Sequence, residues 1–330
     1  MCEKVLCIYH NADLDGICSA AIVYDYFYDA EDASIDGNVI LYGMNYGDDF
    51  PWSFVDEDEM TEEDKEDCIP YDKVVMVDFS LSKEDMKRLN NLVDLIWIDH
   101  HASVIVDNKD IQGIRDINYA ACELTYMYFY TGIAYIDGAP VPLSDKGIPK
   151  AIRLLGRYDV WDHSDKEVVP FQYGMKLYDI GPCNSEWKDL LDNSLISDSI
   201  IKQVIHNGEI IEKYQSNLNY KYVNAYGFVA VLEYEGKLYN VLCVNKGFSN
   251  SSIVKDSILY NKSIIDLIMV FVRHKESYKI SLYTEKEIDV SQIAKTFGGG
   301  GHKKAAGFIC SELEFEDFNG NLIIDIDPNE

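Results

Sequence analysis

Positive charge is scarce in this chain. Its 330 residues include 29 lysines and arginines against 57 aspartates and glutamates, which gives a formal net charge of −28. Binding to a long nucleic acid depends on neutralising many phosphates with lysine and arginine, so this balance disfavours a long nucleic-acid partner. The charge balance does not disfavour a short nucleotide ligand that is held by local charge or by metal ions.

Long hydrophobic runs and paired cysteine motifs are also missing. The longest apolar stretch, Ile264–Val272, is interrupted by Asp266 and is too short to cross a bilayer. The short apolar run in Met1–Tyr9 leads into His10 and not into a cleavage site, so we expect no targeting segment, no membrane partner and a cytoplasmic protein. The eight cysteines include no C-x-x-C pair, which predicts free thiols and argues against a zinc site.

What the chain does contain is a set of short apolar runs that end in histidine or aspartate. They are 5–9 followed by His10, 74–77 followed by Asp78, and 95–98 followed by Asp99, His100 and His101. Continuous apolar runs of this length are typical of buried strands in a parallel sheet. Helical patterns alternate with them, so we expect an α/β domain with right-handed crossovers and ligands at the carboxyl ends of the strands.

The rest of the chain suggests a second domain. A long helical stretch over 196–222 predicts a helix that connects an N-terminal catalytic domain, 1–195, to a smaller C-terminal α/β domain, 223–330. In the C-terminal domain we expect strands, one helix near 251–260 and another that begins at Asp289. An acidic segment, 48–67, carries eleven acids and one lysine and is typical of a solvated insertion or loop.

The acids and imidazoles at the strand ends favour a metal centre. His10, Asp13 and Asp15 lie within six residues, and carboxylates that converge in one loop repel each other unless a cation lies between them. Mixed imidazole and carboxylate ligands suit Mn²⁺ or another divalent first-row metal better than Ca²⁺. Taken alone, this segment is also explained as an acidic turn that caps a helix, and Asp78 as a helix cap or turn former.

The residues are more informative together than singly. A two-metal hydrolase holds its ions about 3.5–4 Å apart, where they orient a water, lower its pKa and clamp the phosphoryl oxygens. Side chains suited to such a pair are present at His10, Asp13, Asp15, Asp78, His100 and Asp159. A carboxylate shared between the ions would be needed, and Asp78 is a good candidate.

A glycine run near the C-terminus predicts a phosphate-binding site. Gly298–Gly307 reads G-G-G-G-H-K-K-A-A-G. Glycine lets backbone N–H groups approach a ligand closely, and successive N–H groups that point one way form an anion-binding concavity. His302, Lys303 and Lys304 add donors and positive charge.

In their order along the chain, these motifs resemble those of the DHH superfamily of phosphoesterases, in the branch that carries a C-terminal DHHA1 domain. The matching residues are His10, Asp13, Asp15 and Gly16 for H-x-x-D-x-D-G, Asp78 for the second motif, Asp99, His100 and His101 for the motif that names the family, Asp159 for the fourth, and Gly299–Gly307 for G-G-G-H-x-x-A-A-G.

The resemblance implies a two-domain enzyme with its active site in the cleft between the domains and two bound Mn²⁺ ions, with Mg²⁺ or Co²⁺ as alternatives. The implied ligands are His10, Asp13 and Asp78 for one ion, and Asp15, Asp78, His100 and Asp159 for the other. The implied catalytic residues are Asp78, His101, which approaches the scissile phosphate, and Asp99, which orients a neighbouring histidine. The implied substrate-binding residues are Gly299, Gly300, Gly301 and His302, which grip the non-scissile end.

One motif departs from this pattern. Many members carry S-L-R-S before the D-V-S segment, where the arginine holds a terminal phosphate, whereas this chain has S-L-Y-T at 281–284. Tyr283 cannot make a bidentate charged contact. Arg273 could replace the missing arginine, or a base or ribose could stack on Tyr283 instead.

The leading hypothesis is a Mn²⁺-dependent phosphodiesterase or phosphatase that converts short nucleotides to nucleoside monophosphates. Candidate substrates are oligoribonucleotides of a few residues, 3′,5′-bisphosphorylated adenosine, and linear or cyclic dinucleotides. A RecJ-like single-strand exonuclease is the second candidate, but it would need a longer basic channel. A non-catalytic nucleotide-binding protein is the third, although every metal-ligand position keeps a suitable side chain. The sequence does not decide between a monomer and a homodimer.

Overall fold

The computed structural model describes residues 4–28, 39–60, 71, 73–101, 110–136, 139–143, 147–178, 181–247, 253, 263–318 and 321–328. The chain forms two compact units, Met1–Ile211 and Glu212–Glu330. The boundary falls within α9 (Leu195–Tyr226), a helix of 32 residues that contains the stretch predicted to be helical over 196–222.

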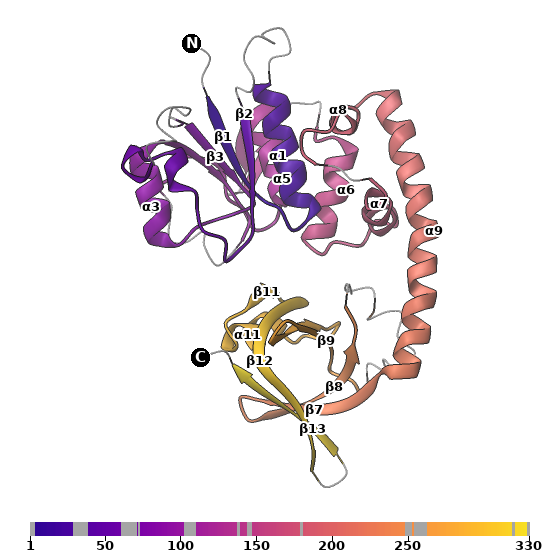
Figure 1. Ribbon diagram of the computed structural model, residues 1–330. Coiled ribbons are helices and arrows are strands. Elements are labelled where there is room, and N and C mark those ends of the chain that lie inside the picture. The colour runs from indigo at the N-terminus through magenta and orange to yellow at the C-terminus, as the bar shows by residue number, and fades with distance from the viewer. Residues whose placement is uncertain are drawn as a thin grey trace. The chain divides into compact units, whose positions relative to one another are not determined.

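A four-stranded parallel sheet is the centre of the first unit (Figure 1). Its strands, in the order β2-β1-β3-β4, are β1 (Val5–His10), β2 (Val39–Met44), β3 (Lys73–Val77) and β4 (Asp94–Ile98). The three apolar runs therefore form buried parallel strands, as the sequence predicts. Strand β2 was not predicted, because four of its six residues are only half-buried or exposed and it lacks a continuous apolar run.

Helices cover both faces of this sheet. Alternate residues of β1 point to opposite sides: Val5 and Cys7 pack with α1 (Leu14–Phe27) and α5 (Ala121–Tyr126), whereas Ile8 packs on the side of α3 (Lys83–Leu92). A π-helical turn (Met127–Thr131) continues α5 and leads into the hairpin of β5 (Ile133–Ile136) and β6 (Ala139–Pro142). Both sheet faces are thereby buried, as parallel strands require.

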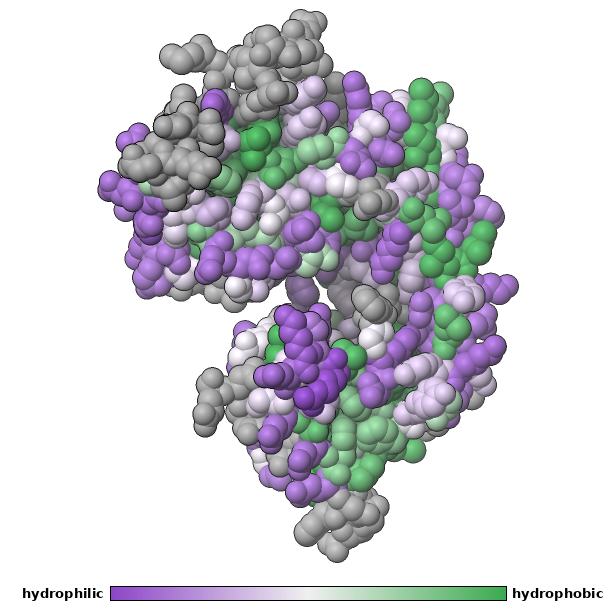
Figure 2. All heavy atoms as spheres, in the orientation of Figure 1, coloured by the Kyte–Doolittle hydropathy of each residue, from purple (hydrophilic) through white to green (hydrophobic). Residues whose placement is uncertain are grey.

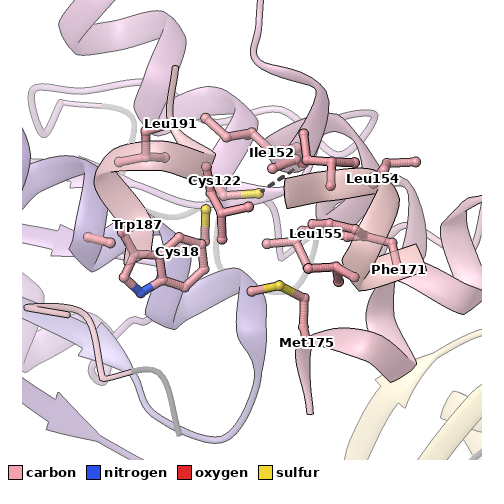
Figure 3. Close-up of a cluster of buried hydrophobic side chains, with 14 of the residues drawn as sticks. Cys18, Cys122, Ile152, Leu154, Leu155, Phe171, Met175, Trp187 and Leu191 are labelled. Atoms are coloured by element: carbon pink, nitrogen blue, oxygen red, sulfur yellow. Dashed lines mark hydrogen bonds between the residues drawn. The ribbon is translucent and has the colours of Figure 1, made fainter. Parts of the chain in front are cut away.

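A second group of helices packs on α1 and α5. It consists of α6 (Lys150–Asp159), α7 (Val168–Met175), α8 (Glu186–Leu190) and the first part of α9. Figure 3 shows their shared apolar cluster, in which Cys122 lies among Leu155, Phe171 and Trp187. Its thiol donates to the carbonyl of Ile152 at 3.7 Å. The cysteines among the described residues are free thiols, as predicted.

The described part of the acidic segment contacts α3. Its first part forms two short 3-10 turns, η1 (Trp52–Phe54) and η2 (Glu57–Glu59). Arg88 of α3 lies 3.9 Å above the Trp52 ring and donates to Asp56 and Glu59, each at 2.7 Å. The acids of this part are nevertheless exposed, apart from half-buried Asp56, as predicted for a solvated insertion or loop. Residues 61–70 lie outside the described residues.

The second unit is built on a seven-stranded sheet with the order β10-β9-β8-β7-β13-β12-β11 and an additional pairing of β10 with β12. Its elements are β7 (Phe228–Tyr234), β8 (Lys237–Asn245), β9 (Leu267–His274), β10 (Ser277–Tyr283), α11 (Val290–Thr296), β11 (Gly300–His302), β12 (Ala305–Phe318) and β13 (Asn321–Pro328). Asp289 caps α11 as expected, accepting from the N–H of Ser291. The helix predicted near 251–260 lies outside the described residues apart from Ile253.

The surface of α9 mixes polar and apolar side chains. Figure 2 shows green and purple spheres interspersed along this helix, and Leu195, Ile210 and Tyr214 are among its exposed apolar residues. Across the described ranges, no helix combines the length and the apolar character needed to span a membrane.

Candidate metal centre

The carboxyl ends of the four parallel strands meet at one edge of the sheet. His10 is the last residue of β1, Asp78 follows β3, and Asp99, His100 and His101 follow β4. Because all four strands run in the same direction, these side chains converge although up to 90 residues separate them in the chain. The structure thus brings the predicted ligands together at the edge where open α/β sheets bind their ligands.

One group of potential ligands surrounds His10. Its Nδ1 lies 3.3 Å from Asp13 Oδ2 and 3.6 Å from Asp78 Oδ2. Ligands at about 2.1 Å from a shared cation lie roughly 3–4 Å from one another, so these spacings suit a common metal ion. His10, Asp13 and Asp78 form one of the groups in which the ligand atoms all lie within 4.8 Å of one another.

A second group surrounds His100. Its Nε2 lies 3.2 Å from Asp159 Oδ2, 3.4 Å from Asp78 Oδ1 and 3.6 Å from Asp15 Oδ2. Asp159 is the last residue of α6, so the helix cluster that packs on α5 positions it. Asp78 thus turns one oxygen toward His10 and the other toward His100, which is the arrangement of a carboxylate shared by two sites.

Asp78 has an unusual backbone. Its φ is +54°, in the left-handed region that aspartate adopts more easily than most residues with a side chain. Its side chain is 2% exposed, so the conformation places a carboxylate in the interior between two imidazoles. Strained backbone of this kind is concentrated at functional sites, where the surrounding structure holds it in place.

Two helix starts fix the carboxylates of the first loop. Asp13 caps α1, since its Oδ1 accepts from the N–H groups of Asp15 and Gly16 at 3.1 and 3.2 Å. Asp15 is held from another helix: its two oxygens accept from the N–H groups of Ala121 and Cys122 at 2.9 and 2.8 Å. Asp13 therefore does cap a helix, and its second oxygen still faces His10.

Gly16 is required by close packing. A Cβ atom at this position would lie 2.0 Å from the carbonyl oxygen of His10. Only glycine lets α1 start directly against the end of β1. The H-x-x-D-x-D-G spacing consequently reflects the meeting of a strand and a helix as well as the ligand set.

Asp99 orients His101. Its Oδ1 accepts from the Nδ1 of His101 at 2.8 Å and from the backbone N–H groups of His100 and His101. Burial opposes the charge of Asp99, but these hydrogen bonds lower its pKa below the ordinary value. An ionised Asp99 keeps the proton of His101 on Nδ1, which leaves Nε2 as the nitrogen that can accept a proton or contact a phosphate.

The centre concentrates negative charge in a buried place. Burial, and then the charge of Asp15, raises the pKa of both Asp78 and Asp159 well above the ordinary value. Burial lowers the pKa of His10, but Asp13 and Asp78 together raise it to about 10. Buried Asp78 Oδ1, Asp159 Oδ2 and His10 Nδ1 have no hydrogen-bond partner among the described residues. Divalent cations would both offset this repulsion and bind these atoms, so the residues present fit a pair of metal ions.

One residue at this centre, Tyr46, was not predicted from the sequence. Tyr46 follows β2, the strand that was not predicted. Its ring centroid lies 5.6 Å from that of His10, 4.9 Å from that of Phe79 and 6.4 Å from that of His101. The polar turn N-Y-G-D at 45–48 is the signal that could have revealed this strand end.

In the second unit, the glycines of the run differ in whether the fold requires them. A Cβ atom on Gly299 would lie 2.1 Å from the carbonyl oxygen of Gly307, and one on Gly301, whose φ is +135°, would lie 2.6 Å from Ala306 Cα. Both are needed for β11 to pair with β12. Gly300 has an ordinary φ and nothing within 4 Å of the space where a Cβ would be, so the fold does not explain this glycine. His302, the last residue of β11, is exposed.

The two lysines of the run are paired. Glu287 accepts from Lys303 Nζ at 2.7 Å and from Lys304 Nζ at 3.1 Å. These contacts lower the pKa of Glu287 to about 2, so it is ionised at neutral pH. Glu287 thus offsets one of the two positive charges of these lysines.

The structure separates the two candidates for the missing arginine. Tyr283 is opposite Ala305 in β12, beside the glycine run, but its ring is 9% exposed and packs in an apolar cluster. Arg273 is opposite Tyr278, at the far end of the β9–β10 hairpin, and donates to the Tyr278 hydroxyl at 3.3 Å. The strand register therefore brings only Tyr283 close to the run, and its buried ring leaves little surface for a base.

Comparison with known proteins identifies the two units. Residues 4–147 match the model of the DHH family, N-terminal domain, and residues 240–324 match that of the DHHA1 domain. A solved DHH domain from a member of the s1p family of ribosomal proteins has the same fold, with a TM-score of 0.55, 13% identity, and coverage of 93% of this chain and 82% of that one.

Two curated proteins are similar in sequence. An uncharacterized protein of Acanthamoeba polyphaga mimivirus is 24% identical over 326 residues, which are 93% of this chain and 68% of that protein. Oligoribonuclease NrnB of Bacillus subtilis (strain 168) is 24% identical over 270 residues, which are 75% of this chain and 61% of that protein.

The fold and the site together define a hydrolase that acts on phosphoric esters. The chain belongs to the DHH superfamily of phosphoesterases, and it carries both the DHH domain and the DHHA1 domain.

Proposed function

We propose that this protein is a Mn²⁺-dependent phosphodiesterase that hydrolyses short oligonucleotides or dinucleotides to nucleoside monophosphates. The observation that carries the proposal is the shared carboxylate: Asp78 lies 3.6 Å from His10 on one side and 3.4 Å from His100 on the other. A bridging carboxylate between two sets of N and O ligands is what a two-metal phosphoesterase requires.

The proposed ligands are the two groups around Asp78. His10, Asp13 and Asp78 would hold one ion, and Asp15, Asp78, His100 and Asp159 would hold the other. When bound, such ions supply an activated water and neutralise charge on the phosphoryl oxygens. Mn²⁺ fits the mixture of imidazole and carboxylate, and Mg²⁺ and Co²⁺ are the alternatives to test.

The protein's own groups would position the substrate. Asp99 holds the His101 ring by its Nδ1, so His101 Nε2 is the atom proposed to contact the scissile phosphate. In the second unit, Gly300 leaves its backbone open to a ligand, and we assign the non-scissile end of the substrate to Gly299, Gly300, Gly301 and His302. That one substrate contacts both units stays a prediction.

Substrate length is inferred from charge and from one relative. The net charge of −28 opposes binding of a long polyanion. NrnB, which aligns with this chain over 61% of its own length, is named an oligoribonuclease. We therefore propose short oligoribonucleotides or dinucleotides, linear or cyclic, as the substrate class, and a site inside the cell.

The test is a length series with Mn²⁺. Purified protein is incubated with di-, tri- and pentanucleotides, a cyclic dinucleotide and a 30-mer single strand, and the products are separated chromatographically. We expect mononucleotide release that is at least about tenfold more efficient from the shortest substrates. A preference for the 30-mer would instead support an exonuclease, and Mn²⁺ binding without cleavage of any substrate would support a nucleotide-binding protein.

Asp78→Asn tests the metal centre. Asparagine keeps the shape of the side chain and tolerates a positive φ, so the variant should fold, but it cannot bridge two cations as a carboxylate does. We expect titration calorimetry to show loss of Mn²⁺ binding, with at least about a 100-fold loss of activity. Asp94→Asn, at the exposed start of β4, is the matched control. Full activity of Asp78→Asn would contradict the two-metal proposal.

A further inference from the structure

An exposed tyrosine lies directly against the candidate metal centre. Of the three rings around it, Phe79 is buried and those of His10 and His101 are half-buried, whereas 56% of Tyr46 is exposed. Its ring contacts the ring of Phe79, and it also neighbours the imidazoles of His10 and His101. Since Phe79 is itself 2% exposed, Tyr46 lies over a buried apolar floor and presents its outer surface to solvent.

The turn that carries Tyr46 is well fixed. The N–H of Asn45 donates to Asp48 Oδ2 at 2.8 Å, and the N–H of Asp48 donates to the carbonyl of Asn45 at 3.0 Å. Gly47 supplies the positive φ of +102° that closes the turn. Strand β2 pairs with β1 so that Met44 is opposite His10. The backbone therefore places the ring beside His10 without needing to bury it in the core.

We infer that Tyr46 is a stacking platform for the nucleobase next to the scissile phosphate. The inference rests on the proposed function and extends it to a specificity-determining residue. One ribose separates a nucleobase from its phosphate. A phosphate bound at the metal centre, beside His10 and His101, therefore puts a base within reach of the Tyr46 ring. Stacking of this kind tolerates any base, because every base has a π-face.

This assignment predicts which phosphoesters the enzyme accepts. An aromatic surface beside the metal centre favours phosphates that carry a base over phosphates that carry none. Stacking contributes about 1–3 kcal/mol per base, which corresponds to roughly 5- to 150-fold in affinity. The enzyme should accordingly discriminate a dinucleotide from its abasic analogues while it discriminates little among the four bases.

The experiment compares an intact dinucleotide with two analogues that each lack one base. Wild type, Tyr46→Ala and Tyr46→Phe are assayed with Mn²⁺ for KM and kcat on all three. We expect Tyr46→Ala to raise KM for the intact substrate by about 5- to 150-fold, and to lose the preference over one of the abasic analogues. Tyr46→Phe should stay within about threefold of wild type, because it keeps the ring. Tyr135→Ala, an exposed tyrosine of β5 (64% exposed), is the matched control.

Several outcomes would overturn the inference. Equal losses for Tyr46→Ala on the intact and both abasic substrates would show that Tyr46 contacts no base. A loss in Tyr46→Phe as large as in Tyr46→Ala would assign the effect to the hydroxyl. Loss of Mn²⁺ binding by calorimetry in Tyr46→Ala would assign Tyr46 to support of the metal centre. A wild-type protein that binds Mn²⁺ but cleaves no substrate would instead refute the proposed function, which makes the two failures distinguishable.

Discussion

At the scale of single residues, Asp78 combines two features that differ in how far sequence can predict them. Its position after an apolar run, taken together with the other acids and imidazoles, made it a candidate shared ligand. Its φ of +54° and its two-sided contact with His10 and His100 depend on the converging strands and on α6, which a local pattern does not encode. Residue type and order were therefore predictable, but backbone strain and burial were not.

The glycine run offers a residue-scale prediction with its own control. Gly300→Ala should fold with an unchanged melting temperature, because no atom lies within 4 Å of the added Cβ. It should raise KM for a dinucleotide by about tenfold, since the methyl group occupies the space in which we place the ligand. Gly299→Ala should instead destabilise the protein by about 1–3 kcal/mol, because its Cβ meets the carbonyl of Gly307 at 2.1 Å.

Thermal unfolding and steady-state kinetics on both variants check this prediction. A Gly300→Ala protein with wild-type KM would remove Gly300 from the substrate site. A Gly299→Ala protein as stable as wild type would show that β11 can move away from β12.

The positions of Tyr283 and Arg273 relative to the glycine run could not be predicted from the sequence. The sequence identified both as replacements for a missing arginine, but it could not reveal the strand register. Antiparallel pairing places Arg273 opposite Tyr278 and Tyr283 opposite Ala305, so they lie at opposite ends of one hairpin. Which of them touches a ligand is a matter of long-range pairing, and it stays untested.

At the scale of elements, β2 is the strand of the first sheet that was not predicted from the sequence. Strands β1, β3 and β4 are nearly fully buried and read as continuous apolar runs. Strand β2 lies at the edge of the sheet and is only partly buried, so its pattern was too weak to predict. Because Tyr46 follows β2, the missed strand also hid the one aromatic side chain that we now assign to the site.

A buried glutamate at the start of α5 predicts how the stability of the fold depends on pH. Glu123 is buried in the first turn of this helix, and its Oε2 accepts from the N–H of Ala120 at 3.4 Å. Burial raises its pKa to about 7, the charge of Asp15 adds to the effect, and Arg157 and Arg153 oppose it. A raised carboxyl pKa means that the folded state binds the proton more tightly. The resulting stability is present below the unfolded pKa of about 4.5 and is lost as pH rises to about 7.

Glu123→Gln should remove this dependence. Relative to wild type, the variant should gain up to about 3 kcal/mol in the free energy of unfolding between pH 4.5 and pH 8. Urea titrations of both proteins across that range measure the difference. Glu57 is an exposed acid of η2, so the free energy of unfolding of Glu57→Gln should change with pH in the same way as that of wild type. A constant difference between Glu123→Gln and wild type would show that Glu123 has an ordinary pKa in the folded protein.

At the scale of the whole molecule, the charge balance connects folding to metal binding. The chain carries a net charge of −28, and several of its acids are gathered at one buried centre. The sequence predicted the α/β class and the order of the motifs, because composition and strand patterns carry that information. It did not predict how the carboxylates are held apart, which depends on the helix starts of α1 and α5.

Metal removal should therefore weaken the fold. We expect EDTA to lower the melting temperature and Mn²⁺ to restore it, since a ligand at 100 times its Kd stabilises a folded protein by about 2.7 kcal/mol. Scanning calorimetry with EDTA, Mn²⁺, Mg²⁺ and Ca²⁺ provides the measurement, and we expect Ca²⁺ to have the smallest effect. Identical melting curves in EDTA and Mn²⁺ would mean that these residues bind no metal.

The pairing of Glu287 with Lys303 and Lys304 affects how ligand binding at the glycine run depends on ionic strength. If lysine charge attracted a phosphate to the glycine run, binding there would weaken steeply as salt is added. Glu287 carries one negative charge against the two positive charges of the lysines, so one lysine charge stays uncompensated and acts beside the fixed dipoles of the backbone amides. Binding at the run should therefore weaken with added salt, but by less than if both lysine charges were uncompensated, because dipoles in direct contact with a ligand are screened less than distant charges.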